Sequence, residues 1–178
     1  MGIIHNIIVV EDVFEAIFKY LPDMKFSEND VKSFPVEFGY GDQKELNAFL
    51  KLSENKENKP YPLIWLIYPN TEEHLKNKVS LKNITFILAV DVNKSGLNKD
   101  RIKTSYKVVL NPLLNNIISV LTRANVINMK HEFKIVKHPN YSAENSNTEE
   151  SKTIANWDAI KITFNCSILN TCLKEIKF

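Results

Sequence analysis

The segment that most constrains the fold is a regular alternation of apolar and polar residues from about Asn156 to Leu169. One set of alternate positions holds Asp158, Ile160, Ile162, Phe164, Cys166 and Ile168, and the other holds Lys161, Thr163, Asn165 and Ser167. Successive side chains of a strand point to opposite faces of its sheet. The pattern therefore predicts a strand with one buried face and one solvent-exposed face, which is typical of antiparallel sheets.

This strand is also unusually long. About 13 residues in extended conformation span roughly 43 Å, which exceeds the length of typical strands. Long exposed strands promote aggregation unless another element or another chain covers them. We therefore expect the strand to cross the whole domain or to project beyond it, where neighbouring copies would cover it.

Four further segments are predicted to be strands. The run from Pro60 to Pro69 is apolar on both faces and is bracketed by prolines, which indicates a buried central strand. The others are Phe34 to Phe38, Leu81 to Val92 and Ile127 to Lys137. Turns are predicted at Gly39 to Asp42 and at Asn93 to Asn98.

Three segments have helical periodicity: Asn6 to Leu21, Glu45 to Leu52 and Lys99 to Ala124. The longest has Asn98 as its expected N-cap. It would run roughly 39 Å, with Pro112 kinking it near Val108. Its predicted core face consists of Ile102, Tyr106, Val109, Leu110, Leu113, Ile117 and Leu121.

The order of these elements predicts the fold class. Strands that are adjacent in sequence favour antiparallel pairing, so we expect an α+β fold in which helices pack on one face of a mostly antiparallel sheet. A length of 178 residues fits a single domain, residues 1–178. Two polar stretches, residues 53–59 and 138–153, are predicted to be mobile loops.

Composition excludes some classes of partner. The 23 basic and 21 acidic residues leave a net charge of +2, which provides no broad electrostatic footprint for nucleic acid. No apolar run approaches the length of a membrane span, so we expect no membrane partner. Cys166 and Cys172 lie on one predicted strand and its end, too far apart to bridge, and indicate free thiols in a reducing compartment.

No motif predicts a cofactor or a metal. Gly39 and Gly41 are followed by Lys44 where a phosphate-binding loop would have a third glycine, so a plain turn is the preferred interpretation. The histidines, His5, His74, His131 and His138, have no partner at metal-ligand spacing. We therefore predict no cofactor, no metal and no catalytic residue.

Three ionisable residues lie on or beside apolar strand faces. Cys166 lies on the apolar face of its strand, where a buried thiol is inert. Asp91 falls opposite the apolar face of its strand and is expected to be solvated. Asp158 is either a buried acid with a partner or a residue at the wet end of its strand, and we favour the wet end.

Lys99, Lys103 and Lys107, with Arg101 nearby, form a basic stripe at the start of the long helix. Cations near a helix N-terminus oppose the macrodipole, at a cost of up to about 0.3–1 kcal/mol each. An acidic partner or a phosphate backbone would offset that cost, so these residues are candidate partner contacts. The alternative is an ordinary solvated face.

Several loose patterns from residue 60 onward occur together. They are the run Pro60-Tyr61-Pro62-Leu63-Ile64-Trp65-Leu66, the helical positions Tyr106, Val109, Leu110, Pro112 and Leu113, the segment His138-Pro139-Asn140-Tyr141, the strand Trp157-Asp158-Ala159-Ile160, and Cys172. This combination resembles small virion proteins of bacteriophages that infect Bacteroidetes and, more broadly, the tail-terminator class. The resemblance implies an α+β, tail-terminator-like fold without catalytic residues.

The resemblance also implies partners. Such proteins form hexameric or dodecameric rings between portal and tail, contact adjacent portal, neck and tail proteins, and let genome DNA pass through the lumen without sequence-specific binding. We therefore expect a structural virion protein in the neck or tail, present in the host cytoplasm during assembly. The alternatives are a cytosolic, non-enzymatic protein-binding module, or an enzyme with a shallow site at Asp91 and the basic stripe.

Overall fold

The computed structural model describes residues 8–25, 32–54, 62–91, 97–130, 132–141 and 157–169. Its helical elements are α1 (Val10–Phe18), α2 (Gln43–Glu54), α3 (Asn98–Arg101), the π-helix η1 (Ile102–Leu110) and α4 (Asn111–Arg123). Its strands are β1 (Glu37–Gly41), β2 (Leu63–Ile67), β3 (Thr71–Leu75), β4 (Lys78–Asp91), β5 (Ile127–Met129), β6 (Lys134–Tyr141) and β7 (Trp157–Leu169).

All described strands belong to one sheet built around the antiparallel pair β4 and β7. The main strand order is β1-β2-β4-β7-β5, with β3 beside β4 and β6 beside β7. β1 and β2 are parallel to each other, and every other pairing is antiparallel. The prediction of an α+β fold with a mostly antiparallel sheet is therefore confirmed. Because β4 and β7 are long, each pairs with two shorter strands on the side that faces away from the other. β4 pairs with β2 and β3, and β7 pairs with β5 and β6.

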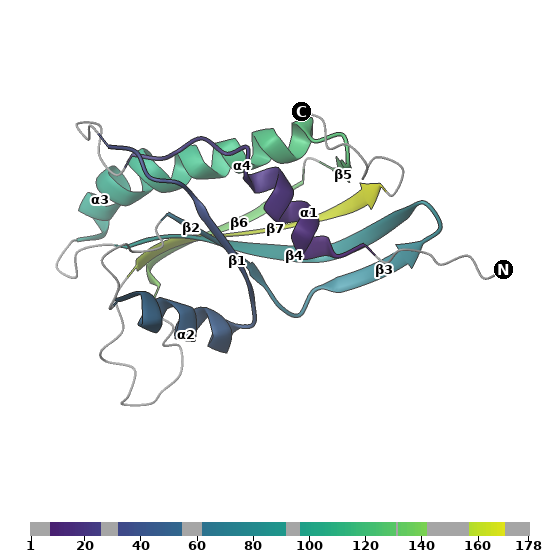
Figure 1. Ribbon diagram of the computed structural model, residues 1–178. Helices are drawn as coiled ribbons and strands as arrows, with labels where there is room; N and C mark the ends of the chain where they lie inside the picture. The colour runs from purple at the N-terminus through teal and green to yellow at the C-terminus, as the bar shows by residue number, and fades with distance from the viewer. Residues whose placement is uncertain are drawn as a thin grey trace.

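The larger core lies between one face of the sheet and a layer formed by α1, η1 and α4 (Figure 1). The alternation that predicted β7 places Ile160, Ile162 and Phe164 in this core. The matching residues of β4 include Phe86, which packs edge-on against Phe14 of α1 with the ring centroids 5.1 Å apart. Alternate positions of the two long strands thus define the buried face, as the sequence predicted.

The helix α2 lies on the opposite face of the sheet (Figure 1). Leu46 and Phe49 of α2 pack against Trp65 of β2 in a second, smaller core that also contains Leu63, Ile87, Ala89, Trp157 and Ala159. The expectation that helices pack on one face therefore applies to α1, η1 and α4 and fails for α2. The reason is that β2 is apolar on both faces, so its second face also requires a cover.

Two features differ from the prediction near the start of the sheet. The predicted turn at Gly39 to Asp42 is mostly strand, because β1 extends to Gly41 alongside β2. The strand β3 is absent from the sequence prediction, since all its side chains are exposed and it has no apolar alternation. It forms a hairpin with β4 through the backbone rather than through side-chain burial.

The predicted strand from Ile127 to Lys137 is interrupted. β5 and β6 both pair with β7, and the chain leaves the ladder between them. Residues 138–141, predicted as part of a mobile loop, belong to β6. The rest of that predicted loop lies outside the described residues, as do residues 55–59 of the other, whereas residues 53–54 end α2.

The long helix covers nearly the predicted residues, but its middle part is not α-helical. Residues 102–110 form a π-helix rather than a kinked α-helix, and the N–H of Asn111 still donates to the carbonyl of Tyr106 five residues earlier. The α-helical pattern resumes at Asn111 with Pro112 in the first turn, where the missing N–H costs least. The π-helix shifts the phase of the buried face, so Ile102, predicted in the core, is 50% exposed while Arg101 is buried.

Close packing at β1 leads to a stability prediction. A Cβ at Gly39 would lie 2.6 Å from the Trp65 ring, which is buried in the second core. Gly39→Ala should therefore lower the free energy of unfolding by about 1–3 kcal/mol, because the ring or the strand must shift. Urea denaturation measures the change.

A double-mutant cycle provides the control. In a Trp65→Leu background the ring is absent, so adding Gly39→Ala should have a clearly smaller effect than in the natural protein. Equal effects in the two backgrounds would show that contact with the Trp65 ring is not the cause.

Candidate functional site

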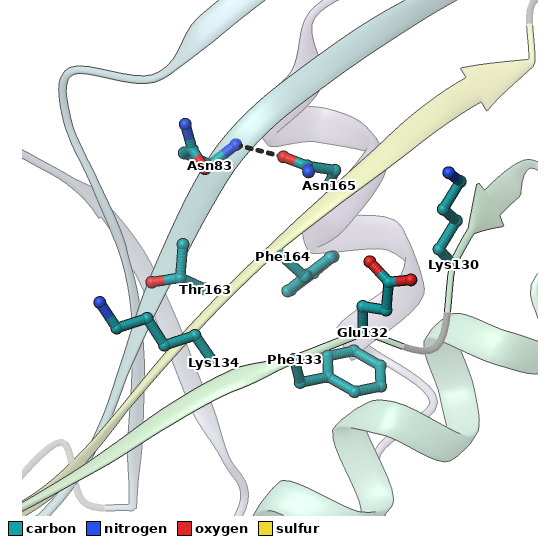
Figure 2. Close-up of a pocket in the computed structure, with 8 residues that line it drawn as sticks. All are labelled: Asn83, Lys130, Glu132, Phe133, Lys134, Thr163, Phe164 and Asn165. Carbon is teal, nitrogen blue, oxygen red and sulfur yellow. Dashed lines mark hydrogen bonds between the residues drawn. The ribbon is translucent and has the colours of Figure 1, made fainter.

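A depression lies where the segment between β5 and β6 passes the middle of β7 (Figure 2). It has a volume of about 560 Å³. Its lining residues come from the two long strands, from the segment between β5 and β6 and from the first residue of β6: Asn83, Lys130, Glu132, Phe133, Lys134, Thr163, Phe164 and Asn165. Figure 2 shows Lys130 and Lys134 on opposite sides of it.

The depression exists because the regular pairing of β7 is interrupted on both sides at one level. On the β4 side, the register shifts between Leu81 and Ile84, which leaves Asn83 in a bulge with a positive φ of 55°. Asparagine tolerates this conformation better than most residues. On the other side, β5 pairs as far as Cys166 and β6 pairs only from Thr163, so the sheet opens between them.

The bulge is held by a side-chain hydrogen bond. The backbone N–H of Asn83 donates to Oδ1 of Asn165 at 2.7 Å, which takes the place of a backbone ladder hydrogen bond at the bulge. Next to it, the hydroxyls of Thr85 and Thr163 lie 2.9 Å apart. These amide and hydroxyl groups, with the two lysines, can hydrogen-bond a peptide or an acidic side chain. Within the described ranges, no cluster of His, Cys, Asp and Glu could hold a metal ion.

A second polar feature is a buried ion pair between the long helix and β7. Nη1 of Arg101 lies 3.0 Å from Oδ1 of Asp158, and the two side chains are 3% and 0% exposed. Five residues along the helix, the hydroxyl of Tyr106 donates to the carbonyl of Ala159 at 3.2 Å. Burial, followed by the charge of Asp158, raises the pKa of Tyr106, so this hydroxyl remains a donor.

The π-helix is what allows Arg101 and Tyr106 to reach the same strand. In an α-helix, residues five apart point roughly 140° away from each other. In a π-helix, i and i+5 are hydrogen-bonded neighbours on one side. The guanidinium and the carboxylate are buried between the helix and the strand, so this cluster anchors the start of the helix to the start of β7.

Two predictions change here. Asp158, expected at the wet end of its strand, is fully buried, and the alternative of a paired acid is the correct one. Arg101, predicted as part of the basic stripe, faces the sheet and is not a surface contact. Lys99, Lys103 and Lys107 are exposed, so these three remain the candidate partner contacts. The signal that could have found the pair is a carboxylate on an apolar strand face, which requires a partner.

The remaining candidates from the sequence are dispersed. Cys166 is buried as predicted, and burial raises its pKa to about 12. His74 lies 3.1 Å from Glu72 on the exposed strand β3. Burial and the charge of Lys161 lower the pKa of His138.

Asp91 is partly buried at the end of β4. Cys172, His5 and His131 lie outside the described residues.

The edge strands of the sheet are a feature that sequence reasoning missed. β1, β3, β5 and β6 each have a strand neighbour on one side only, as far as the described residues extend. Their exposed side chains include large apolar ones: Leu75 on β3 is 43% exposed, and Ile135 and Val136 on β6 are 42% and 37% exposed. An edge strand presents unpaired backbone N–H and C=O groups that a further strand can pair with.

Neither a scan of protein-family models nor a search of curated protein sequences found a match to this chain. Within the part of the chain that the structure describes, no helix has the length and apolar character needed to cross a membrane.

The buried ion pair gives a stability prediction. Arg101→Ala should lower the free energy of unfolding by about 3–5 kcal/mol, because it leaves the Asp158 carboxylate buried without its cation. Lys99→Ala, two residues earlier and exposed, is the matched control and should change stability by less than about 0.5 kcal/mol. Urea denaturation followed by circular dichroism compares them. Similar values for both variants would contradict a structural role for the pair.

The buried thiol gives a reactivity prediction. In a Cys172→Ser variant, Cys166 is the remaining cysteine. With its pKa raised to about 12, it should stay protonated and unreactive toward iodoacetamide at about pH 8 in the folded protein. In urea the same thiol should label readily. Rapid labelling of the folded variant, followed by mass spectrometry, would contradict this.

Proposed function

We propose that this protein is a structural virion protein that forms a homo-oligomeric ring in the neck or tail of a tailed bacteriophage. In this role, copies of the chain would join portal-side and tail-side components around the channel through which the genome passes. The observation that carries the proposal is the pair of exposed strands β3 and β6 on opposite sides of one sheet, each with a single strand neighbour among the described residues.

Two different edges favour a ring over a simple dimer. An interface that joins one surface of a subunit to a different surface of the next is heterologous, and repeating it closes into a ring when the rotation allows. A sheet with one open edge would instead favour pairing with itself. Here β3 lies outside β4 and β6 lies outside β7, so a copy can be added on each side.

The resemblance to phage tail-terminator proteins supports the same proposal. It rests on residues 60 onward and implies an α+β fold, which agrees with the observed class. The exposed Lys99, Lys103 and Lys107 on α3 and η1 would then contact an acidic neighbour or the DNA in the lumen. The uncovered, polar part of the sheet is a further surface for stacked rings.

The proposal predicts the assembly state of the purified chain. Mass should rise with concentration in sedimentation velocity, and negative-stain electron microscopy should show closed rings with six or twelve subunits. The physical reason is that an edge strand gains backbone hydrogen bonds when a strand of another copy pairs with it. A monomer of the chain's mass at every concentration would contradict the proposal and favour a protein-binding module.

A further inference from the structure

We infer that the ring is held by antiparallel pairing of β6 of one copy with β3 of the next, so that the sheet continues from subunit to subunit. This inference rests on the proposed function, because the occupant of each edge is a second copy of the chain. It goes further by naming the two strands, their register and the charged side chains that select it.

The directions of the two strands suit this pairing. β3 and β7 both run antiparallel to β4, and β6 runs antiparallel to β7, so β3 and β6 point in opposite directions. When two copies stand side by side in the same orientation, β6 of one therefore meets β3 of the other as an antiparallel pair. Antiparallel pairing is slightly the more stable arrangement per residue.

The positions of β3 and β6 along the β4–β7 ladder also suit a closed ring. β3 pairs with residues 78–82 of β4, near one end of its ladder with β7, whereas β6 pairs with residues 157–163 of β7, near the other end. Pairing β6 with β3 therefore staggers each copy along the strand direction. A sheet that closes around a lumen requires tilted strands and a staggered register.

The alternation of side chains restricts the register. On the face covered by α1, η1 and α4, β6 presents Ile135 and Lys137, and β3 presents Glu72 and His74. On the opposite face, β6 presents Lys134, Val136 and His138, and β3 presents Thr71, Glu73 and Leu75. A continuous sheet keeps each set on its own face, so the register can shift only by two residues at a time.

Charge and the overlap of the two strands together favour one of these registers. When Lys137 stands opposite Glu72, Val136 stands opposite Glu73, and Lys134 is the diagonal neighbour of Glu73 on the same face. Directly opposed unlike charges stabilise a sheet, and long side chains also reach a diagonal neighbour. Moving the register by two residues one way places Pro139, which has no N–H to donate, opposite Glu72. Moving it the other way places Lys134 opposite Glu73 but leaves only three residues of β3 paired with β6.

The composition of the two edges supports this choice of partner over β1. β6 is basic, with Lys134 and Lys137 exposed, and β3 carries the adjacent acids Glu72 and Glu73, both exposed. β1 has Glu37 as its one charged residue and contains two glycines, which weaken a strand. β6 is therefore expected to pair with β3 of the next copy rather than with its β1.

Charge reversal provides the first test. Lys134→Glu with Lys137→Glu should raise the concentration needed for assembly about tenfold or more, because two attractive contacts become repulsive. Adding Glu72→Lys and Glu73→Lys in the same chain should restore assembly. Sedimentation velocity measures the midpoint, and circular dichroism checks that each variant is folded. Assembly that is unchanged in the lysine variant, or not restored in the fourfold variant, would overturn the inference.

Disulfide trapping provides the second test. In a Cys172→Ser background, Val136→Cys with Glu73→Cys places the two cysteines directly opposite each other across the predicted interface, at a Cα separation of about 4.5–5.5 Å that a disulfide spans. Oxidation should then give a ladder of covalent oligomers in denaturing electrophoresis. The matched control, Val136→Cys with Glu37→Cys, reports pairing with β1 instead and should stay monomeric.

The outcomes separate the two proposals. Rings that give a ladder with Glu37→Cys, or with neither pair, would refute the β6–β3 interface while leaving the ring itself intact. A chain that neither forms rings nor cross-links at the highest concentration would contradict the interface and the proposed function together.

Discussion

The rest of the structure depends on the hydrogen-bonded ladder between β4 and β7. It runs from Lys78 opposite Leu169 to Asp91 opposite Trp157, with one break at the bulge. Every other described strand except β1 attaches to one of these two strands, and the helical layer packs on their shared apolar face. Because the two strands are longer than any of their partners, they also create the offset between β3 at one end and β6 at the other.

The bulge in β4 shows how a local irregularity in this ladder becomes a surface feature. At Asn83 the regular pairing with β7 is interrupted, and the side-chain amide of Asn165 accepts the hydrogen bond of the Asn83 N–H. At the same level β5 ends and β6 has not begun, so β7 has no described strand on its other side. The depression results from this coincidence and adjoins the β6 edge through Lys134.

The sequence predicts an element and its buried face where the buried residues recur at a regular spacing. The alternation in β7, the doubly apolar run of β2 and the periodicity of α1 each predict the element and its buried face. Periodicity does not predict a strand that is exposed on both faces, or one whose position is set by pairing with a distant strand. β3 is exposed along its whole length, and nothing in Thr71 to Leu75 distinguishes a hairpin strand from a polar loop. The position of β6 likewise depends on its distant partner β7, because it is mostly exposed.

The buried ion pair is harder to predict for the same reason. The sequence favours a wet Asp158 because its partner, Arg101, is 57 residues away along the chain. Pairing them also requires the π-helix, which no α-helical periodicity anticipates, and the same change of phase exposes Ile102. A buried ion pair rarely stabilises more than a well-packed apolar pair, so we infer that Arg101 and Asp158 serve to position the helix on β7.

This ion pair connects the interior of the protein to the proposed interface. Arg101 and Asp158 fix the start of the long helix over β7, and Tyr106 bonds to Ala159 on the same strand. Lys137 of β6 in turn lies 5.3 Å from the centre of the Tyr106 ring. The edge strand is thus held by its ladder with β7 and also contacts the helix that the ion pair anchors. A fixed edge loses less conformational entropy when a neighbouring strand joins it.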